Sequence, residues 1–256
     1  MKVARFSVAG DIRFGIVDED ELIVLAGDPM YAGWDTTGER VPLSVAVLLA
    51  PAIPRSKVVC VGKNYFDHVQ EMGGGDAPAE PLLFLKPNTS VIGPNDAIVR
   101  PRVSERVDFE GELAIVIGAV AKNVHEADAN KVIFGYTIAN DVTARDLQAR
   151  DGQWARAKGF DTFCPLGPVI ETEFDIASSR LETRLNGEVR QQATFDLLMF
   201  GIQRIVAAAT EAFTMLPGDV ILTGTPAGIG PMVAGDVVEV TIDGIGTLRN
   251  SIIDAP

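Results

Sequence analysis

Short apolar runs of strand length recur along almost the whole chain, and only one long stretch has apolar residues at helical spacing. That stretch is "TFDLLMFGIQRIVAAATEAFTML", whereas runs such as "KVARFSVAG", "ELIVLAG" and "ELAIVIG" have the length and alternation of strands. The order lacks the regular alternation of strand and helix that builds a doubly wound sheet. The sequence therefore predicts an α+β fold that is mostly β, with a few helices.

Two regions are expected to fold as separate units. Residues 1 to about 27 have the pattern of a small β-meander, with turn residues between short alternating strands. The following segment "PLSVAVLLAPAIP" is predicted to be a short helix that its prolines at 51 and 54 bring to an end. This Pro-rich exit separates a small N-terminal β-rich domain, residues 1–54, from a main domain, residues 55–256.

Composition excludes several classes of protein. The chain of 256 residues is 47% apolar, which is enough for a substantial core. A net charge of −13 repels phosphate backbones and anionic headgroups, so we expect neither a nucleic-acid nor a membrane partner. No apolar run approaches the roughly 18 residues that span a bilayer. With only two cysteines and no signal-peptide pattern at the start, a cytoplasmic location is expected.

The segment "VDFEGELAIVIG" places two glutamates, separated by one glycine, at the start of an apolar strand. Side chains alternate along a strand, so Glu110 and Glu112 are expected on the same side. Asp141 follows the apolar run "GYTIAN" at the end of another strand. Three such carboxylates can bind a hard cation such as Mg²⁺, Mn²⁺ or Ca²⁺. From spacing alone, solvated acids at strand ends explain the pattern at least as well.

A second candidate is His68, with Glu71 three residues later in "DHVQEMGGG". On a helix these positions share a face, so the carboxylate can orient the imidazole as a general base. The glycines at 73–75 would let the helix move as a lid. Taken by itself, the segment is better explained as a surface helix followed by a flexible loop.

Two further segments offer polar groups. "NDVTARDLQARDGQWARAKGFD" contains Arg145, Gln148 and Lys158, which can bind a carboxylate or stabilise an oxyanion. The alternative is an amphipathic helix whose charges are solvated. "ILTGTPAGIGP" lacks the Lys-Ser/Thr of a phosphate loop, so we expect a strand-end loop that offers the Thr225 hydroxyl and backbone N–H groups to a small anion.

The order of these motifs is more specific than any one of them. Together they resemble the catalytic domain of the fumarylacetoacetate hydrolase superfamily over about residues 56–253. The resemblance rests on six consecutive segments: "VGKNYFDHVQEMG", "PLLFLKPNTSVIGP", "VDFEGELAIVIG", "GYTIANDVTARDLQ", "AKGFDTFCPLGPVI" and "ILTGTPAGIGP". It implies a mixed β-roll or β-sandwich with a few helices, and a homodimer.

The resemblance also implies roles for individual residues. It assigns Mg²⁺ or Mn²⁺ to Glu110, Glu112 and Asp141. Some members of the superfamily have a fourth carboxylate ligand in the segment before the lid. Here that segment, "VGKNY", contains no acid, so water or substrate should complete the coordination shell of the metal. Lys63 stands where many relatives carry arginine. Lysine keeps the positive charge, but it cannot bind a carboxylate through two parallel hydrogen bonds as arginine does. The implied catalytic residues are His68, Glu71 and Lys158. The implied substrate-binding residues are Lys63, Tyr65, Arg145, Gln148 and Thr225.

The implied substrates are small anionic 2-oxo acids or β-dicarbonyl carboxylates. We expect divalent-metal-dependent cleavage of a C–C bond, by hydrolysis or decarboxylation, in a compound such as an acylpyruvate, fumarylpyruvate or oxaloacetate. The alternative within the superfamily is isomerisation or decarboxylation of a 2-hydroxyhepta-2,4-diene-1,7-dioate in aromatic catabolism. An alternative from another class is an inactive protein that keeps the fold and binds metal and ligand.

Overall fold

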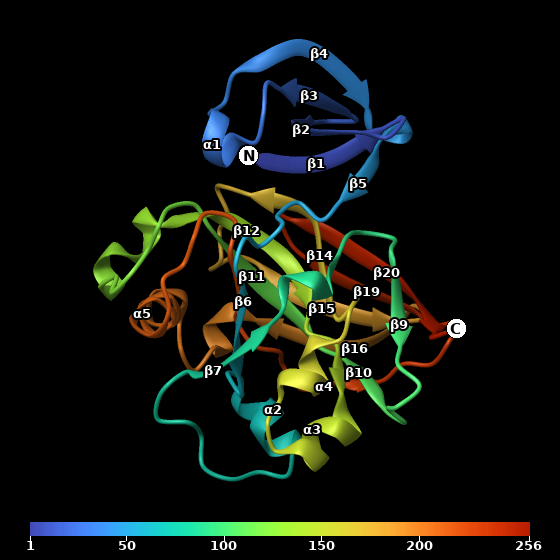
Figure 1. The fold of residues 1–256 in the computed structure, drawn as a ribbon. Coiled ribbons are helices and arrows are strands. Elements are labelled where there is room, and N and C mark those ends of the chain that lie inside the picture. Colours follow the sequence, from blue (N-terminus) through green and yellow to red (C-terminus); the bar gives the residue numbers. More distant parts are fainter.

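The protein is built mainly from strands, with a few short helices packed around them (Figure 1). A computed structural model describes all residues, 1–256. The expected mostly-β α+β class is confirmed. The N-terminal strands lie at one end of the molecule, and α2, α3 and α4 lie together at the opposite end (Figure 1).

The N-terminal strands form an antiparallel meander, as the sequence predicts. Its four members pair in chain order: β1 (Lys2–Val8), β2 (Asp11–Asp18), β3 (Glu21–Leu25) and β4 (Thr36–Pro42). The short helix α1 (Pro29–Ala32) lies between β3 and β4. The meander is joined to the rest of the chain through β1, which pairs with β14 of the main body.

The predicted helix in "PLSVAVLLAPAIP" is wrong. Only Leu43–Val45 form a single 3₁₀ turn, and Val47–Leu49 form strand β5. This strand pairs antiparallel with β1, with Arg5 opposite Leu49 and Ser7 opposite Val47. The backbone groups on that side of β1 would otherwise lack partners, and a run rich in Val and Leu suits a strand. Tertiary pairing therefore overrides the local helical pattern.

The largest sheet runs from the meander through the centre of the molecule. Beyond β1 its strands follow in the order β14 (Cys164–Glu171), β12 (Ile133–Asn140), β11 (Gly111–Ile117), β17 (Val220–Leu222), β6 (Val58–Gly62) and β7 (Leu82–Lys86). A two-residue strand, β8 (Val91–Ile92), pairs with β14. Most neighbours are antiparallel, whereas β17 and β6 are parallel.

Two smaller sheets complete the main body. The five-stranded sheet has the order β16 (Glu188–Thr194), β15 (Arg180–Leu185), β19 (Val237–Ile242), β20 (Gly246–Asp254) and β9 (Ala97–Arg100). The three-stranded sheet has the order β13 (Thr143–Ala144), β10 (Val107–Phe109) and β18 (Gly230–Pro231). The C-terminal strands β19 and β20 form an antiparallel hairpin.

The helices are short. They are α2 (Phe66–Glu71), α3 (Arg145–Asp151), α4 (Ala155–Gly159) and α5 (Ile202–Ala212), with further 3₁₀ turns at Asn88–Ser90, Glu126–Lys131 and Phe195–Leu197. The predicted long helix is confirmed only as α5, because the chain at Gly201 is extended and the helix begins after it. No helix has both the length and the apolar composition that a membrane span needs.

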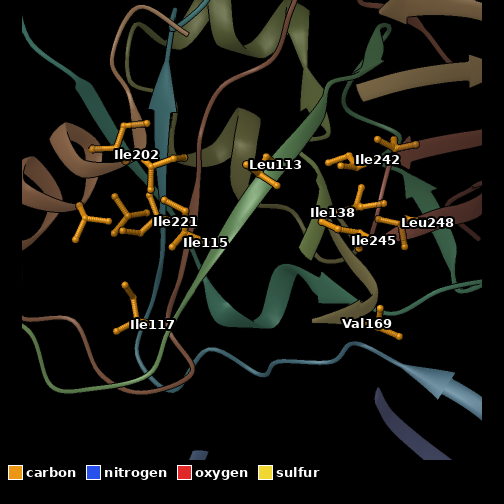
Figure 2. Close-up of a cluster of buried hydrophobic side chains, with 14 of the residues drawn as sticks. Leu113, Ile115, Ile117, Ile138, Val169, Ile202, Ile221, Ile242, Ile245 and Leu248 are labelled. Atoms are coloured by element: carbon orange, nitrogen blue, oxygen red, sulfur yellow. The ribbon is translucent and has the colours of Figure 1, made fainter. Parts of the chain in front are cut away.

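Strand β11 is the centre of the core, because every one of its residues is buried. Leu113, Ile115 and Ile117 belong to the largest hydrophobic cluster, whereas Ala114 and Val116 pack into a second cluster. Figure 2 shows β11 crossing the first cluster, with side chains of α5 and β17 on one side and of the β19–β20 hairpin on the other. A slip of one residue would exchange the two faces, so packing fixes the register of β11.

Asp219 connects the start of β17 to the segment that leads into β6. Its side chain is fully buried and accepts hydrogen bonds from the Ser56 hydroxyl at 2.6 Å and from the backbone N–H of Leu216 at 2.9 Å. The Lys57 ammonium lies 3.2 Å away. Burial raises the pKa of Asp219, but the hydrogen bonds and Lys57 outweigh it and lower the pKa below its ordinary value.

We predict that Asp219→Asn lowers the free energy of unfolding at pH 7 by about 1.5–3 kcal/mol, the usual contribution of hydrogen bonds to a charged group. A folded-state pKa below the unfolded value means that this stabilisation is present above about pH 4 and is lost as the pH falls through the folded pKa. Urea denaturation at pH 7 and near pH 3 measures the free energy of unfolding of wild type and variant. The difference between the two free energies should be smaller at the lower pH.

The control is Asp243→Asn, because Asp243 forms an exposed ion pair with Arg180. It should change the free energy of unfolding by less than about 1 kcal/mol. Two results would contradict the role given to Asp219. One is an equal loss of unfolding free energy in the two variants, and the other is a difference between wild type and Asp219→Asn that grows as the pH falls.

Candidate active site

One cavity of about 340 Å³ gathers most of the residues that the sequence singles out. It lies among the C-terminal end of β6, the start of β11 and the helices α2, α3 and α4. Nine expected site residues line it: Lys63, His68, Glu110, Glu112, Asp141, Arg145, Gln148, Lys158 and Thr225. The structure thus brings together segments that are up to about 160 residues apart in the chain.

The three acids meet where β11 and β12 pair. Gly111 stands opposite Asn140, so Glu110 just before β11 and Asp141 just after β12 are neighbours across the strands. The Asp141 N–H donates to the Glu110 carbonyl at 2.8 Å. Glu112 follows on the same side, and one carboxylate oxygen of each acid lies within 4.8 Å of the others. All three are at least 96% buried, so the explanation as solvated strand-end acids is excluded.

Three cations neutralise this buried charge. The Lys158 ammonium lies 2.8 Å from Glu110 and 2.6 Å from Asp141, so it bridges two of the acids. The Lys86 ammonium lies 2.5 Å from Asp141, and a guanidinium nitrogen of Arg145 lies 2.5 Å from Glu110. Buried charges persist only when they are paired. The three acids and the three cations make the cluster neutral as a whole.

Lys86 is a residue of this cluster that the sequence analysis missed. It ends β7 in "PLLFLKP", which belongs to one of the six segments that carry the resemblance, and it is 1% exposed. Besides Asp141 it donates to the carbonyl of Val142 at 3.1 Å. A lysine that ends an apolar strand has to be paired if it is buried, but the strand pattern does not show that this end is buried.

Glu112 is the one acid of the three without a cationic partner. Its only hydrogen bond comes from the Gly224 N–H at 2.6 Å. Burial, and then the negative charges of Asp141 and Glu110, raise its pKa well above the ordinary value. A cation between the three carboxylates would remove this penalty. The donor set is oxygen only, which fits Mg²⁺ or Mn²⁺, so the residues present fit a divalent metal.

The pKa values of the paired groups shift in the opposite sense. Burial alone would raise the pKa of Glu110, but Lys158 and Arg145 lower it below its ordinary value. Burial alone would lower the pKa of Lys158, but Asp141 and Glu110 raise it. Glu110 is therefore ionised and Lys158 protonated at neutral pH, which keeps Glu110 ready to act as a ligand.

Arg145 is occupied by protein partners. Its Nε donates to the Asp108 carboxylate at 2.9 Å, and one terminal nitrogen donates to the side-chain amide oxygen of Gln148 at 2.7 Å. Together with Glu110 these contacts use both edges of the guanidinium, and Asp108 is a partner that the sequence analysis did not identify. The geometry therefore gives Arg145 the function of holding Glu110 and Gln148 in place. Its expected contact with substrate stays a prediction.

His68 and Glu71 form a hydrogen-bonded pair on α2. The His68 Nδ1 lies 3.1 Å from one Glu71 oxygen, and the other oxygen accepts from the Gly228 N–H at 3.0 Å. Because an ionised carboxylate only accepts, Nδ1 carries the proton and Nε2 is left as the basic nitrogen. His68 is 6% exposed and lines the cavity. The i, i+3 spacing thus produces an oriented imidazole rather than a solvated surface residue.

Lys63 and Tyr65 differ in their placement. Lys63 lines the cavity directly after β6, has a positive φ of 58° and forms no salt bridge, so its charge is free for a ligand. Tyr65 is buried and precedes α2, and it borders a separate small hollow rather than the cavity. Burial, followed by the negative charge of Glu112, raises the pKa of Tyr65 above its ordinary value. The structure does not bring Tyr65 to the cavity.

An apolar wall faces the charged cluster, and the sequence analysis did not identify it. Phe84 and Trp154 pack edge to face with ring centroids 5.2 Å apart, and both line the cavity with Met72. Gly62 makes room for this pair, because a Cβ there would lie 2.8 Å from the Trp154 ring. The cavity therefore has one charged side and one apolar side, which is the usual composition of a small-molecule site.

Comparisons with known families agree with this geometry. The family described as "Fumarylacetoacetate (FAA) hydrolase C-terminal" matches residues 57–253, and the family described as "Rv2993c-like, N-terminal" matches residues 1–51. Among curated relatives, Protein Rv2993c of Mycobacterium tuberculosis is 56% identical over 85% of this chain and 82% of its own. Oxaloacetate tautomerase YisK of Bacillus subtilis is 41% identical over 82% of this chain and 74% of its own.

Solved structures share the whole fold. The 5-carboxymethyl-2-hydroxymuconate delta-isomerase of Mycobacterium smegmatis is 46% identical, with a TM-score of 0.93 over 100% of both chains. The maleylpyruvate hydrolase of Sphingobium sp. SYK-6, in complex with manganese (II) ion and pyruvate, is 31% identical, with a TM-score of 0.82 over 100% of both chains. Since the first family model covers residues 57–253 and a relative that is 56% identical matches 85% of the chain, this protein belongs to the fumarylacetoacetate hydrolase family.

Proposed function

We propose that this protein is a divalent-metal-dependent enzyme that cleaves the C3–C4 bond of a small 2-oxo acid, by hydrolysis or decarboxylation. The observation that carries the proposal is a single cavity in which the His68–Glu71 pair faces a buried cluster of three carboxylates. Relatives in the same family are named as hydrolases, isomerases and tautomerases, which supports an enzyme.

We propose Mg²⁺ or Mn²⁺ as the cofactor, with Glu110, Glu112 and Asp141 as its ligands. The unpaired and buried Glu112 supports this assignment, and a relative of known structure is in complex with manganese (II). When bound, such an ion acts as a Lewis acid that stabilises negative charge on carboxylate and carbonyl oxygens. Lys158 and Lys86 remain beside Asp141 and limit the repulsion between the acids.

The charges of the cavity support an anionic substrate. The cluster itself is neutral without an ion, and Lys63 adds a positive charge that no protein group neutralises. A cavity of about 340 Å³ is at the small end of the range for ligand sites, roughly 300–1,000 Å³. Its apolar wall of Phe84 and Trp154 suits the part of the substrate beyond the keto acid.

His68 is proposed as the general base. In hydrolysis its Nε2 accepts a proton from water as the water oxygen attacks the C4 carbonyl of the substrate. The C3–C4 bond then breaks, its electron pair remains on the 2-oxo acid as an enolate, and C3 takes up a proton. Glu71 keeps the imidazole in the required tautomer through the contact at Nδ1. In decarboxylation the same bond breaks without water, and His68 takes up a proton from solvent at Nε2 and delivers it to C3.

A second candidate is proton transfer without bond cleavage. The observation that favours it is the naming of relatives more than 40% identical as an oxaloacetate tautomerase and a carboxymethyl-hydroxymuconate isomerase. Both candidates need a base beside C3 and stabilisation of an enolate, so the same residues serve either reaction. The fate of the C3–C4 bond distinguishes them.

A substrate panel tests the proposal. The protein is incubated with Mg²⁺ or Mn²⁺ and with oxaloacetate, acetylpyruvate, fumarylpyruvate or 2-hydroxyhepta-2,4-diene-1,7-dioate, while lactate dehydrogenase and NADH report pyruvate. We expect pyruvate from at least one of the first three. A change in enol absorbance without pyruvate supports the second candidate instead. Binding of these compounds without any conversion would indicate an inactive metal- and ligand-binding protein.

Metal binding is tested independently of turnover. A ligand present at about 100 times its dissociation constant adds about 2.7 kcal/mol to stability, which for a chain of this size raises the melting temperature by roughly 5–10 °C. We expect such a shift with Mg²⁺ or Mn²⁺ in the wild type and its loss in Glu112→Gln. The control Glu188→Gln, in an exposed acid, should keep the shift. An undiminished shift in Glu112→Gln would exclude Glu112 as a ligand.

For His68→Ala we expect kcat for cleavage to fall by about 10²- to 10⁴-fold, the usual contribution of a general base, while the metal-induced shift in melting temperature is kept. The matched control is His125→Ala. His125 is the only other histidine, it is exposed, and its Nδ1 accepts a hydrogen bond from the backbone N–H of Ala127. Steady-state kinetics with the best substrate of the panel provides the measurement. A rate within twofold of wild type would remove His68 from the mechanism.

A further inference from the structure

Gln191, on β16, is a buried amide whose hydrogen-bonding groups are all used. Its side chain is only 1% exposed. The carbonyl oxygen accepts from the Gly111 N–H at 3.0 Å, and the amide nitrogen donates to the Thr225 hydroxyl and to the Pro226 carbonyl, both at 2.8 Å. An amide offers one acceptor and two donors in a fixed plane, and no other uncharged side chain of this size does so.

The partners of Gln191 lie in two different parts of the active site. Gly111 stands between the acids Glu110 and Glu112, so one bond is made to the strand that carries the carboxylate cluster. Thr225 and Pro226 begin the segment that ends at Gly228, whose N–H binds Glu71. Thr225 also donates to the Gly111 carbonyl at 2.9 Å, which closes a ring of hydrogen bonds around the amide.

The hairpin that carries Gln191 fits closely against both parts. A Cβ at Gly111 would lie 2.2 Å from the Thr183 hydroxyl on β15. A Cβ at Gly228 would lie 1.9 Å from the Arg190 carbonyl on β16, and Gly228 has a positive φ of 102°. Glycine is therefore required at both positions. The β15–β16 hairpin packs directly against both segments.

We propose that Gln191 is a positioning residue that fixes the distance between the carboxylate cluster and the His68–Glu71 pair. It does not line the cavity, so it acts through Gly111 on one side and through the segment 225–228 on the other. Its role in catalysis rests on the proposed function, whereas its role in holding the segment 225–228 and α2 does not.

The test uses Gln191→Met, which keeps the length of the side chain and removes all three hydrogen bonds. The control is Gln192→Met, because Gln192 is exposed on the other face of β16 and bonds only Glu182. Two measurements are made on each variant: hydrogen–deuterium exchange of the backbone, and steady-state kinetics with the substrate identified by the panel.

For Gln191→Met we expect backbone exchange in 66–73 and 225–230 to become at least about tenfold faster, while exchange in β19 and β20 stays as in wild type. We expect kcat to fall by roughly 10- to 100-fold with KM within about threefold, because a displaced base slows the chemical step more than binding. Gln192→Met should match wild type in both measurements. Unchanged exchange in 66–73 and 225–230, or acceleration spread evenly over the whole hairpin and β19, would overturn the proposal.

A second variant covers the case in which Gln191→Met does not fold. Gln191→Glu keeps the shape and the acceptor for Gly111, but it places an oxygen beside the Pro226 carbonyl and loses the paired donors. We expect faster exchange in 225–230 and 66–73 and wild-type exchange in β11. Faster exchange in β11 alone would contradict the proposal. Because exchange needs no substrate, a wild type that converts none of the tested compounds would refute the proposed function and still leave this test decisive.

Discussion

The burial of three carboxylates at the paired ends of β11 and β12 is the constraint on which the rest of the site depends. Charges removed from water are costly unless opposite charges stand beside them. Lys158, Lys86 and Arg145 provide them at hydrogen-bonding distance. One carboxylate, that of Glu112, is left without a cation. The folded cluster is neutral as a whole, but Glu112 has no positive charge beside it, and a divalent ion held between the three carboxylates would supply one.

The fold supplies the compensating charges from separate elements. The acids come from the central and rigid part of the large sheet, where β11 is buried on both faces. The cations come from the edge strand β7 and from the short helices α3 and α4, which cover the strand ends (Figure 1). His68, the proposed base, comes from α2 and lines the same cavity.

Much of this could be predicted from the sequence, because period-two alternation and strand-end acids are local signals. Glu110, Glu112 and Asp141 were found in this way, and the order of motifs gave the family. Lys86 was missed because a strand pattern does not say which of its ends is buried. Tyr65 was assigned to the cavity by its motif, whereas the structure turns it toward a neighbouring hollow. Gln191 could not be found, because its partners lie 80 and 34 residues away and only the folded chain brings them together.

The tight approach of Gly228 to Arg190 has a consequence for any outward swing of α2. At Gly228 the loop packs so closely against the hairpin that a Cβ there would lie 1.9 Å from the Arg190 carbonyl, so the loop contacts the hairpin more closely than it contacts α2. Such a swing has to break the contact between Glu71 and the Gly228 N–H, at a cost of about 1.5–3 kcal/mol for a bond to a charged group. The glycines at 73–75, which follow α2, would then be the hinge of the motion. The hydrogen bond between Glu71 and the Gly228 N–H would hold the helix in its present position. Because His68 and Glu71 are both on α2, their contact would move with the helix, and only the bond to Gly228 would be broken and remade.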